Sequence, residues 1–284
     1  MNRKKAVVCS VTAILVLVIS QLVAGLLSNV FGAVGVPKVI CNALAGIIYF
    51  TVTLIIVAVF YGKIMHLDVK ELGIKKFSIK NKWILIGLIL PIAVEIFYIL
   101  MISVKYLPSG MSNKKIAETL SLGIIYTGLG TGFVEEIVFR GIIFQSLEKA
   151  WNTKIAVIVP SVLFGIVHIL GKSFSVGSAL LVILAGTAVG IMFSMITIES
   201  GSIWCNGLVH AFWNMIIIGD GLSIGEKADK LSVANYVLDT NKFALTGGEF
   251  GIESSVVALV GYIIVTVIAV YMIKREKHLS TLPA

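Results

Sequence analysis

Two adjacent glutamates and an arginine interrupt a hydrophobic stretch near the middle of the chain, in Gly-Phe-Val-Glu-Glu-Ile-Val-Phe-Arg-Gly at 132–141. On a helix, Arg140 follows Glu136 by one turn, so the two side chains can pair directly. Glu135 is rotated by about 100° from Glu136 and is less easily claimed by the arginine. The spacing therefore predicts one anchored glutamate and one that is free to react. Alone, the pair fits a structural ion pair equally well.

Two histidines and an asparagine follow in later hydrophobic stretches. His168 comes one helical turn after Phe164 on an otherwise apolar segment, where a lone histidine is more often a core residue than a catalyst. His210 and Asn214 are four residues apart, which places both on one helix face, where two donors can point at one oxygen. The plainer interpretation of that pair is a polar contact between helices, worth about 0.6 kcal/mol in a membrane.

Together these groups fit amide hydrolysis. The reaction needs a base that takes a proton from water, a group that orients the water, and donors for the negative oxygen of the tetrahedral intermediate. We expect Glu135 and His168 to activate water, and His210 and Asn214 to stabilise the oxygen. No Ser, Thr or Cys is obviously paired with a base, so activated water is favoured over a covalent intermediate. Cys205 lies five residues before His210, about 140° away on a helix, and is expected to be buried like Cys9 and Cys41.

The elements that carry these residues are predicted to be membrane-spanning helices. Of the 284 residues, 58% are hydrophobic and 13% are charged, and the mean hydropathy is +1.01. Eight apolar blocks have roughly the length that crosses about 30 Å of hydrocarbon; they are 6–27, 39–62, 83–104, 119–147, 155–170, 178–198, 201–218 and 254–273. The expected fold is all-α and polytopic, with a single integral membrane domain over 1–284, because the longest polar stretch, 219–253, is too short for a sizeable soluble domain.

The net charge of +8 does not predict a nucleic-acid partner, because the cations follow the connections between helices. One set of alternate connections holds 14 of them: Arg3, Lys4, Lys5, Lys63, Lys70, Lys75, Lys76, Lys80, Lys82, Lys149, Lys154, Lys274, Arg275 and Lys277. The other set holds 8: Lys38, Lys105, Lys114, Lys115, Lys172, Lys227, Lys230 and Lys242. Loops rich in Lys and Arg stay in the cytoplasm, so both termini are predicted to be cytoplasmic.

The motifs resemble those of a known family. Glu-Glu-x-x-x-Arg at 135–140, Phe-x-x-x-His at 164–168 and His-x-x-x-Asn at 210–214, in that order on three hydrophobic segments, are similar to the CPBP family. This family contains the type II CAAX prenyl endopeptidases and the bacterial Abi and bacteriocin-immunity membrane proteins. The ordered triplet is specific and covers about 80 residues, whereas the first 115 residues carry no signature.

The resemblance implies an intramembrane endopeptidase of about eight helices that enclose a cavity open to the cytoplasmic side, with the family core at about 119–218. Its catalytic residues would be Glu135, Glu136, Arg140, His168, His210 and Asn214, with neither metal nor cofactor. The substrate would be a membrane-associated peptide or protein in the bilayer. The Lys- and Ile-rich composition and the bacteriocin-immunity branch suggest the cell membrane of a Gram-positive bacterium.

Three other functions are open. A zinc-dependent intramembrane metalloprotease could draw ligands from three helices, although His-Glu-x-x-His is absent. A non-catalytic scaffold or bacteriocin-immunity protein would bind a partner through its helices. A transporter could use the same groups as a proton relay, but the clustering in three adjacent segments, without two matched halves, disfavours it. Glu95, in another predicted helix, has no role in any of these proposals.

Overall fold

The computed structural model describes residues 1–280 and is mostly helical. The helices are α1 (Arg3–Ala33), α2 (Lys38–Ile56), α3 (Asn81–Met101), α4 (Asn113–Ser121), α5 (Gly132–Glu136), α6 (Phe144–Ala150), α7 (Thr153–Val167), α8 (Val176–Ser200), α9 (Ile203–Trp213), α10 (Phe243–Thr246) and α11 (Val256–Ser280). The strands are β1 (Val104–Pro108), β2 (Leu222–Gly225) and β3 (Ala234–Leu238). The π-helical segments Val57–Ile64, Leu122–Thr131, Ile137–Ile143 and Asn214–Ile218 continue α2, α4, α5 and α9.

Six helical stretches among the described residues are long and apolar enough to span a bilayer: Arg3–Ala33, Lys38–Ile64, Asn81–Met101, Asn113–Ala150, Val176–Ser200 and Val256–Glu276. The chain is therefore a multi-pass membrane protein. The predicted spans at 155–170 and 201–218 correspond to the shorter apolar helices Thr153–Val167 and Ile203–Ile218. The predicted number of eight spans is thus not confirmed.

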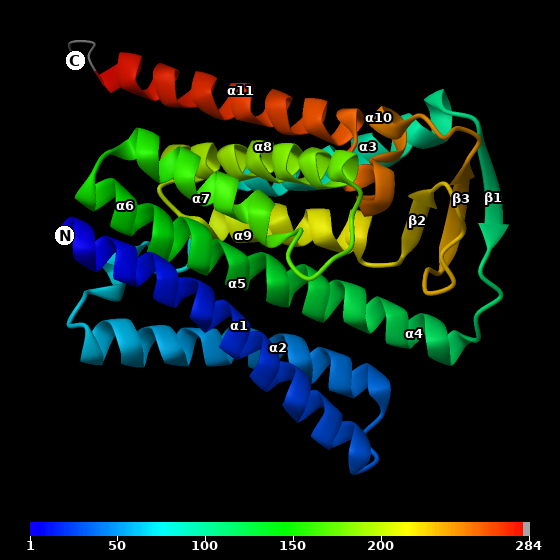
Figure 1. Ribbon diagram of the computed structural model, residues 1–284, viewed down its shortest axis with the longest axis horizontal. Coiled ribbons are helices and arrows are strands. Elements are labelled where there is room, and N and C mark those ends of the chain that lie inside the picture. Colours follow the sequence, from blue (N-terminus) through cyan, green and yellow to red (C-terminus); the bar gives the residue numbers. More distant parts are fainter. Residues whose placement is uncertain (281–284) are drawn as a thin grey trace.

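The helices run back and forth along the long axis of the molecule, and the N-terminus and the far end of α11 lie at the same end (Figure 1). We call this the terminal end; it also carries the connections 65–80 and 201–202. The opposite end, which we call the strand end, carries the connections 102–112, 168–175 and 219–255 and the three strands. The lysine-rich connection 65–80 thus lies at the end opposite to the connections 102–112, 168–175 and 219–255.

A small sheet at the strand end is absent from the all-α prediction, which therefore needs correction. Its strand order is β1-β3-β2, with β1 antiparallel and β2 parallel to β3. Val104 pairs with Leu238, and Leu222 pairs with Ala234. Each strand has four or five residues and lies in a connection between helices, so neither its length nor its periodicity stands out beside apolar blocks of about 20 residues.

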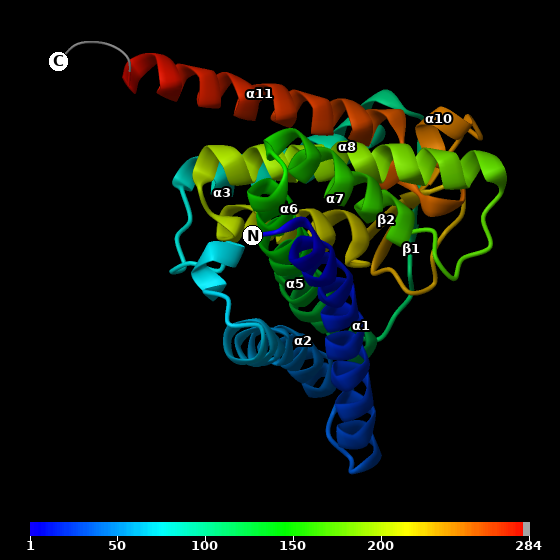
Figure 2. The ribbon, with the colours of Figure 1, turned by 60° about the vertical axis from the view of Figure 1, so that its left-hand side comes forward.

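The hairpin of α1 and α2 projects from the body that contains α3, α7, α8 and α11 (Figure 2). The segment 113–150 lies between the two parts, where its helices pack against α2 and α9. Gly132, the first residue of α5, allows a very close approach to α9, because a Cβ at this position would lie 2.7 Å from the backbone nitrogen of Ala211. This contact brings the Glu-Glu motif beside the His-x-x-x-Asn motif.

Candidate active site

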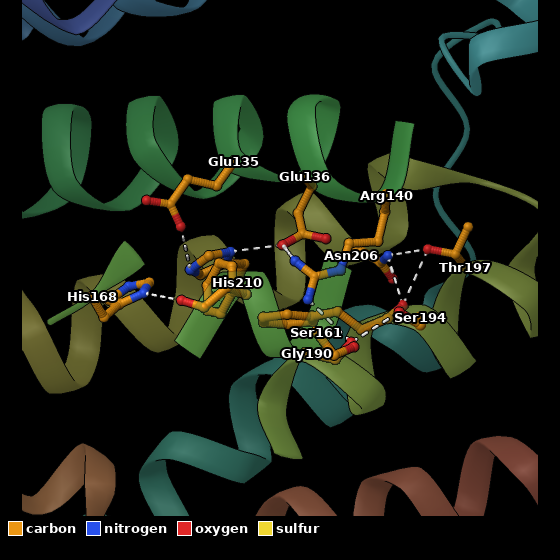
Figure 3. A network of polar contacts seen from close by, with 12 residues as sticks. Glu135, Glu136, Arg140, Ser161, His168, Gly190, Ser194, Thr197, Asn206 and His210 are labelled. Atoms are coloured by element: carbon orange, nitrogen blue, oxygen red, sulfur yellow. Dashed lines mark hydrogen bonds and ion pairs between the residues drawn. The ribbon is translucent and has the colours of Figure 1, made fainter. Parts of the chain in front are cut away.

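Glu136 is held by two donors from two helices. Its Oε1 atom accepts a hydrogen bond from Arg140 Nη1 at 2.8 Å and lies 3.0 Å from His210 Nδ1 (Figure 3). Because this carboxylate oxygen is an acceptor, we assign the proton of the second contact to Nδ1. Glu136 is only 1% exposed. The expected pair with Arg140 therefore forms, and it also fixes the orientation of the His210 ring.

Arg140 also contacts the two neighbouring helices α7 and α8. Its Nη2 atom donates to the backbone oxygen of Gly190 on α8 at 3.1 Å. The guanidinium lies 4.9 Å from the ring centre of Phe164 and 5.0 Å from that of Phe193. Such cation–π contacts stabilise a charge that is removed from water. We call Glu136, Arg140, Phe164 and Phe193 the sealed layer.

Glu135 points away from the sealed layer and lines a cavity. Its side chain is 15% exposed, and its Oε2 atom lies 3.8 Å from His210 Nε2. Within residues 1–280, no hydrogen bond ends on this carboxylate, so its oxygens are available to a water molecule or a substrate. The two glutamate side chains point in different directions, as the helical rotation predicts. His210, which was expected to act only with Asn214, in fact lies between both carboxylates.

His168 lines the same cavity, at the residue where α7 ends. Its Nδ1 atom lies 2.6 Å from the backbone oxygen of Phe164, which can only accept, so Nδ1 donates and Nε2 is the atom left for chemistry. No hydrogen bond or ion pair joins His168 to Glu135 in the described part of the chain. The two side chains face one cavity without direct contact.

Asn214 also lines the cavity, and it is the first residue of the π-helical segment that follows α9. Its Nδ2 atom donates to the backbone oxygen of Thr127 at 3.0 Å. Since an amide nitrogen carries two protons, this bond orients the side chain and leaves one proton to donate. His210 and Asn214 thus share one cavity, as their spacing predicts.

The cavity has a volume of about 420 Å³ and combines an apolar wall with ionisable groups. Val182, Ala185 and Val189 of α8 form part of the apolar wall. Lys172 and Glu253 add two ionisable groups that were not expected in the site, because both lie in connections outside the apolar blocks. Burial raises the pKa of Glu253 to about 8; Lys172 opposes this shift and Glu135 adds to it.

Other residues lie outside this site. Glu95, on α3, is half-buried and does not line the cavity. Cys9, Cys41 and Cys205 are buried as predicted. Cys205 Sγ accepts from the backbone nitrogen of Lys80 at 3.4 Å, away from His210. Among residues 1–280, no group of three or more His, Cys, Asp or Glu side chains is arranged to hold a metal ion.

Comparison with known proteins confirms the resemblance. Residues 117–216 match the family described as "Type II CAAX prenyl endopeptidase Rce1-like". The chain is also 30% identical over 103 residues to a Bacillus subtilis (strain 168) protein named "Putative membrane peptidase YdiL". That similarity covers 36% of this chain and only 38% of the relative's length. No solved structure matches.

Proposed function

We propose that this protein is an intramembrane endopeptidase that hydrolyses a peptide bond of a membrane-associated protein or peptide with activated water. The observation that carries the proposal is the contrast between two adjacent carboxylates. Glu136 accepts bonds from Arg140 and His210, whereas Glu135 faces the cavity with no hydrogen bond among the described residues. A carboxylate exposed to a cavity at membrane depth is costly, which favours a chemical purpose. The family match and the named relative support a membrane peptidase.

In the proposed mechanism, Glu135 takes a proton from a water molecule in the cavity while His168 Nε2 orients that water. The oxygen attacks the carbonyl carbon, and the negative charge that develops on the carbonyl oxygen is stabilised by Asn214 Nδ2 and by a protonated Nε2 of His210. Glu135 then returns its proton to the leaving amine. Glu136 and Arg140 act through His210, because they fix its ring with Nε2 toward Glu135.

The alternatives have less support. A zinc site needs at least three protein ligands around one position, and residues 1–280 provide no such group. A non-catalytic scaffold or bacteriocin-immunity protein would gain nothing from Glu135, His168 and Asn214 around one cavity. We therefore propose Glu135 as the base rather than as a zinc ligand.

Comparative membrane proteomics tests this function and would identify the substrate. Cells that produce the wild type should be compared with cells that produce Glu135→Gln at the same level. We expect a precursor to accumulate only in the variant, with its shorter product only in the wild type. Identical membrane proteomes, with both proteins folded, would contradict the proposal.

Chelation separates the glutamate mechanism from the zinc alternative. The purified protein in detergent should cleave the peptide identified above equally well before and after exhaustive chelation. Stoichiometric zinc in the sample, together with activity that is lost on chelation and restored by zinc, would overturn the glutamate mechanism and make Glu135, His168 and His210 ligands.

A further inference from the structure

A second cavity of the protein is apolar and lies apart from the catalytic one. It is located between α2, the segment Asn113–Ala150, α9 and the connection 65–80, and its volume of about 420 Å³ is within the usual range for a ligand site. Every residue that lines it is a glycine, isoleucine, leucine or phenylalanine. Among the described residues, the two cavities share no lining side chain. We call this second cavity the apolar groove.

The apolar groove runs along the molecule from the terminal end toward the middle. Phe77 and Ile79 line it from the connection 65–80, which Figure 2 shows between the α1–α2 hairpin and α3. On the segment Asn113–Ala150, the lining residues extend from Ile125 to Phe133, or about two helical turns. Because membrane-spanning helices run across the bilayer, a groove along them has the direction of a lipid hydrocarbon chain.

Two hydrogen bonds to the start of α9 fix the terminal end of the groove. Trp204 Nε1 donates to the backbone oxygen of Lys75 at 2.9 Å, and Ser202 Oγ donates to that of Ser78 at 2.8 Å. The ring centres of Phe77 and Trp204 are 5.4 Å apart, although Phe77 is 61% exposed. The groove is therefore preformed, and an exposed aromatic ring lies at its rim.

Two cations lie next to this rim, because Lys75 and Lys76 immediately precede Phe77. Both lysines are exposed, and within residues 1–280 neither ammonium group has an ion pair or a hydrogen bond. By contrast, Lys80 and Lys82 contact Glu199. The terminal end is also the end expected in the cytoplasm, where the membrane surface is anionic. The two free lysines are thus available to an anionic headgroup.

We propose that the apolar groove binds one anionic phospholipid, with an acyl chain against α2 and the segment Asn113–Ala150 and the phosphate at Lys75 and Lys76. An apolar wall with cations at one end matches the two parts of such a lipid. A zwitterionic lipid fills the groove equally well but gains less from the lysines. The bound chain contacts Phe133, two residues before Glu135 on α5. The site itself does not depend on the proposed function.

Native mass spectrometry of the full chain in detergent counts bound lipids and tests the headgroup contact. Anionic phosphatidylglycerol is compared with phosphatidylcholine that has the same acyl chains. We expect one phosphatidylglycerol molecule to bind about 10 to 30-fold more tightly, because each lysine near a membrane surface contributes roughly a fivefold factor. Lys75→Gln combined with Lys76→Gln should abolish this preference. The matched control, Lys227→Gln combined with Lys230→Gln, changes two exposed lysines at the strand end and should keep it.

A second pair of variants tests the hydrocarbon contact. Ile47 and Ile55 are 57% and 56% exposed on α2, but of the two only Ile47 lines the groove. Ile47→Trp fills the groove and should weaken the binding of both lipids by about tenfold or more, since two buried methylene groups already contribute that much. Ile55→Trp should bind both lipids as the wild type does.

Three results would overturn the proposal. One is equal affinity of the wild type for the two lipids, which is expected of lipids that only surround the protein. Another is an unchanged preference when Lys75 and Lys76 are both replaced by Gln. The third is unchanged binding by folded Ile47→Trp. If Ile47→Trp does not fold, the lysine variants decide the question, because they alter exposed side chains only.

Discussion

Glu136 belongs to the sealed layer and Glu135 lines the cavity, so two consecutive glutamates have opposite environments. Glu136 is 1% exposed, and one of its oxygens accepts from both Arg140 and His210. The Glu135 side chain is 15% exposed, and its Oε2 atom lies 3.8 Å from His210 Nε2. A rotation of one residue on a helix therefore separates a buried, paired carboxylate from one that lines the cavity. His210 contacts both and links the two regions.

A third carboxylate shows what a purely structural site looks like. Glu199, near the end of α8, is 4% exposed and accepts from Trp83 Nε1 at 2.8 Å and from Lys82. Lys80 lies 3.8 Å from the same carboxylate. These donors saturate Glu199, which does not line the catalytic cavity. It provides a control for any effect of removing a buried charge.

The largest effect is expected for Glu135→Gln, which keeps the shape of the side chain but removes the base. The kcat should fall by about 10² to 10⁴-fold, while the free energy of unfolding should change by less than about 0.5 kcal/mol, because no hydrogen bond is lost. Peptide cleavage and thermal unfolding of the same detergent sample measure both. Glu199→Gln should show the reverse pattern, with lower stability and nearly normal kcat. Wild-type activity in Glu135→Gln would remove this residue from the mechanism.

Arg140→Ala should damage the sealed layer. It leaves Glu136 buried with His210 as its remaining hydrogen-bond partner, and breaking a buried ion pair by removing one partner costs about 3–5 kcal/mol. Activity should fall as well, because His210 loses its fixed acceptor. Arg140→Lys should recover part of the stability, since a lysine keeps the charge but not the forked geometry that reaches both Glu136 and Gly190. If Arg140→Ala had the same free energy of unfolding as the wild type, the stability of the layer would not depend on the ion pair.

Asn214→Ala should act on the cavity side only. Loss of one donor to the developing oxyanion lowers kcat by about 10² to 10³-fold with a smaller change in KM. The matched control is Asn206→Ala, because Asn206 is also a buried amide, donates to the backbone oxygen of Phe193 at 2.8 Å and does not line the cavity. It should lower stability and leave kcat nearly unchanged. Equal kcat values for the two variants would argue against a role for Asn214 in the transition state.

The smallest effect concerns Glu253, which lines the cavity. Since burial raises its pKa to about 8, the folded protein resists ionisation of this group, and its unfavourable contribution to stability grows as the pH rises from about 4.5 through 8. Glu253→Gln should therefore melt at a higher temperature than the wild type at pH 9 and at a similar temperature at pH 5. If the melting temperatures of the wild type and Glu253→Gln changed in parallel across this pH range, they would contradict the raised pKa.

Spacing along one helix predicted much of the site, and contacts between helices explain what it missed. The Glu136–Arg140 pair and the different direction of Glu135 follow from helical rotation alone. The position of His210 between both glutamates depends on the close approach of α5 and α9 at Gly132, which one sequence does not reveal. The roles of the individual site residues stay predictions, as does the orientation in the membrane.

The fold was predicted to a similar extent. Hydropathy located the helices, because each apolar block must cross or enter the bilayer. It overestimated the length of α7, where the helix ends at Val167 and the apolar residues continue into a turn to Leu170. It also missed the sheet, since β1 pairs with β3 across about 130 residues of chain.

The early end of α7 also has a consequence for the surrounding lipid. Its 15 residues extend about 22 Å, whereas the hydrocarbon core of a bilayer is about 30 Å thick. Ile158 and Val159 are exposed on this helix, and Leu170, just beyond it, is 65% exposed. A bilayer of ordinary thickness would extend beyond so short a helix, which favours local thinning of the lipid on this flank. Such thinning would bring the polar headgroups closer to His168, which lines the cavity at the end of α7, and would shorten the path that a hydrophilic peptide must travel through hydrocarbon.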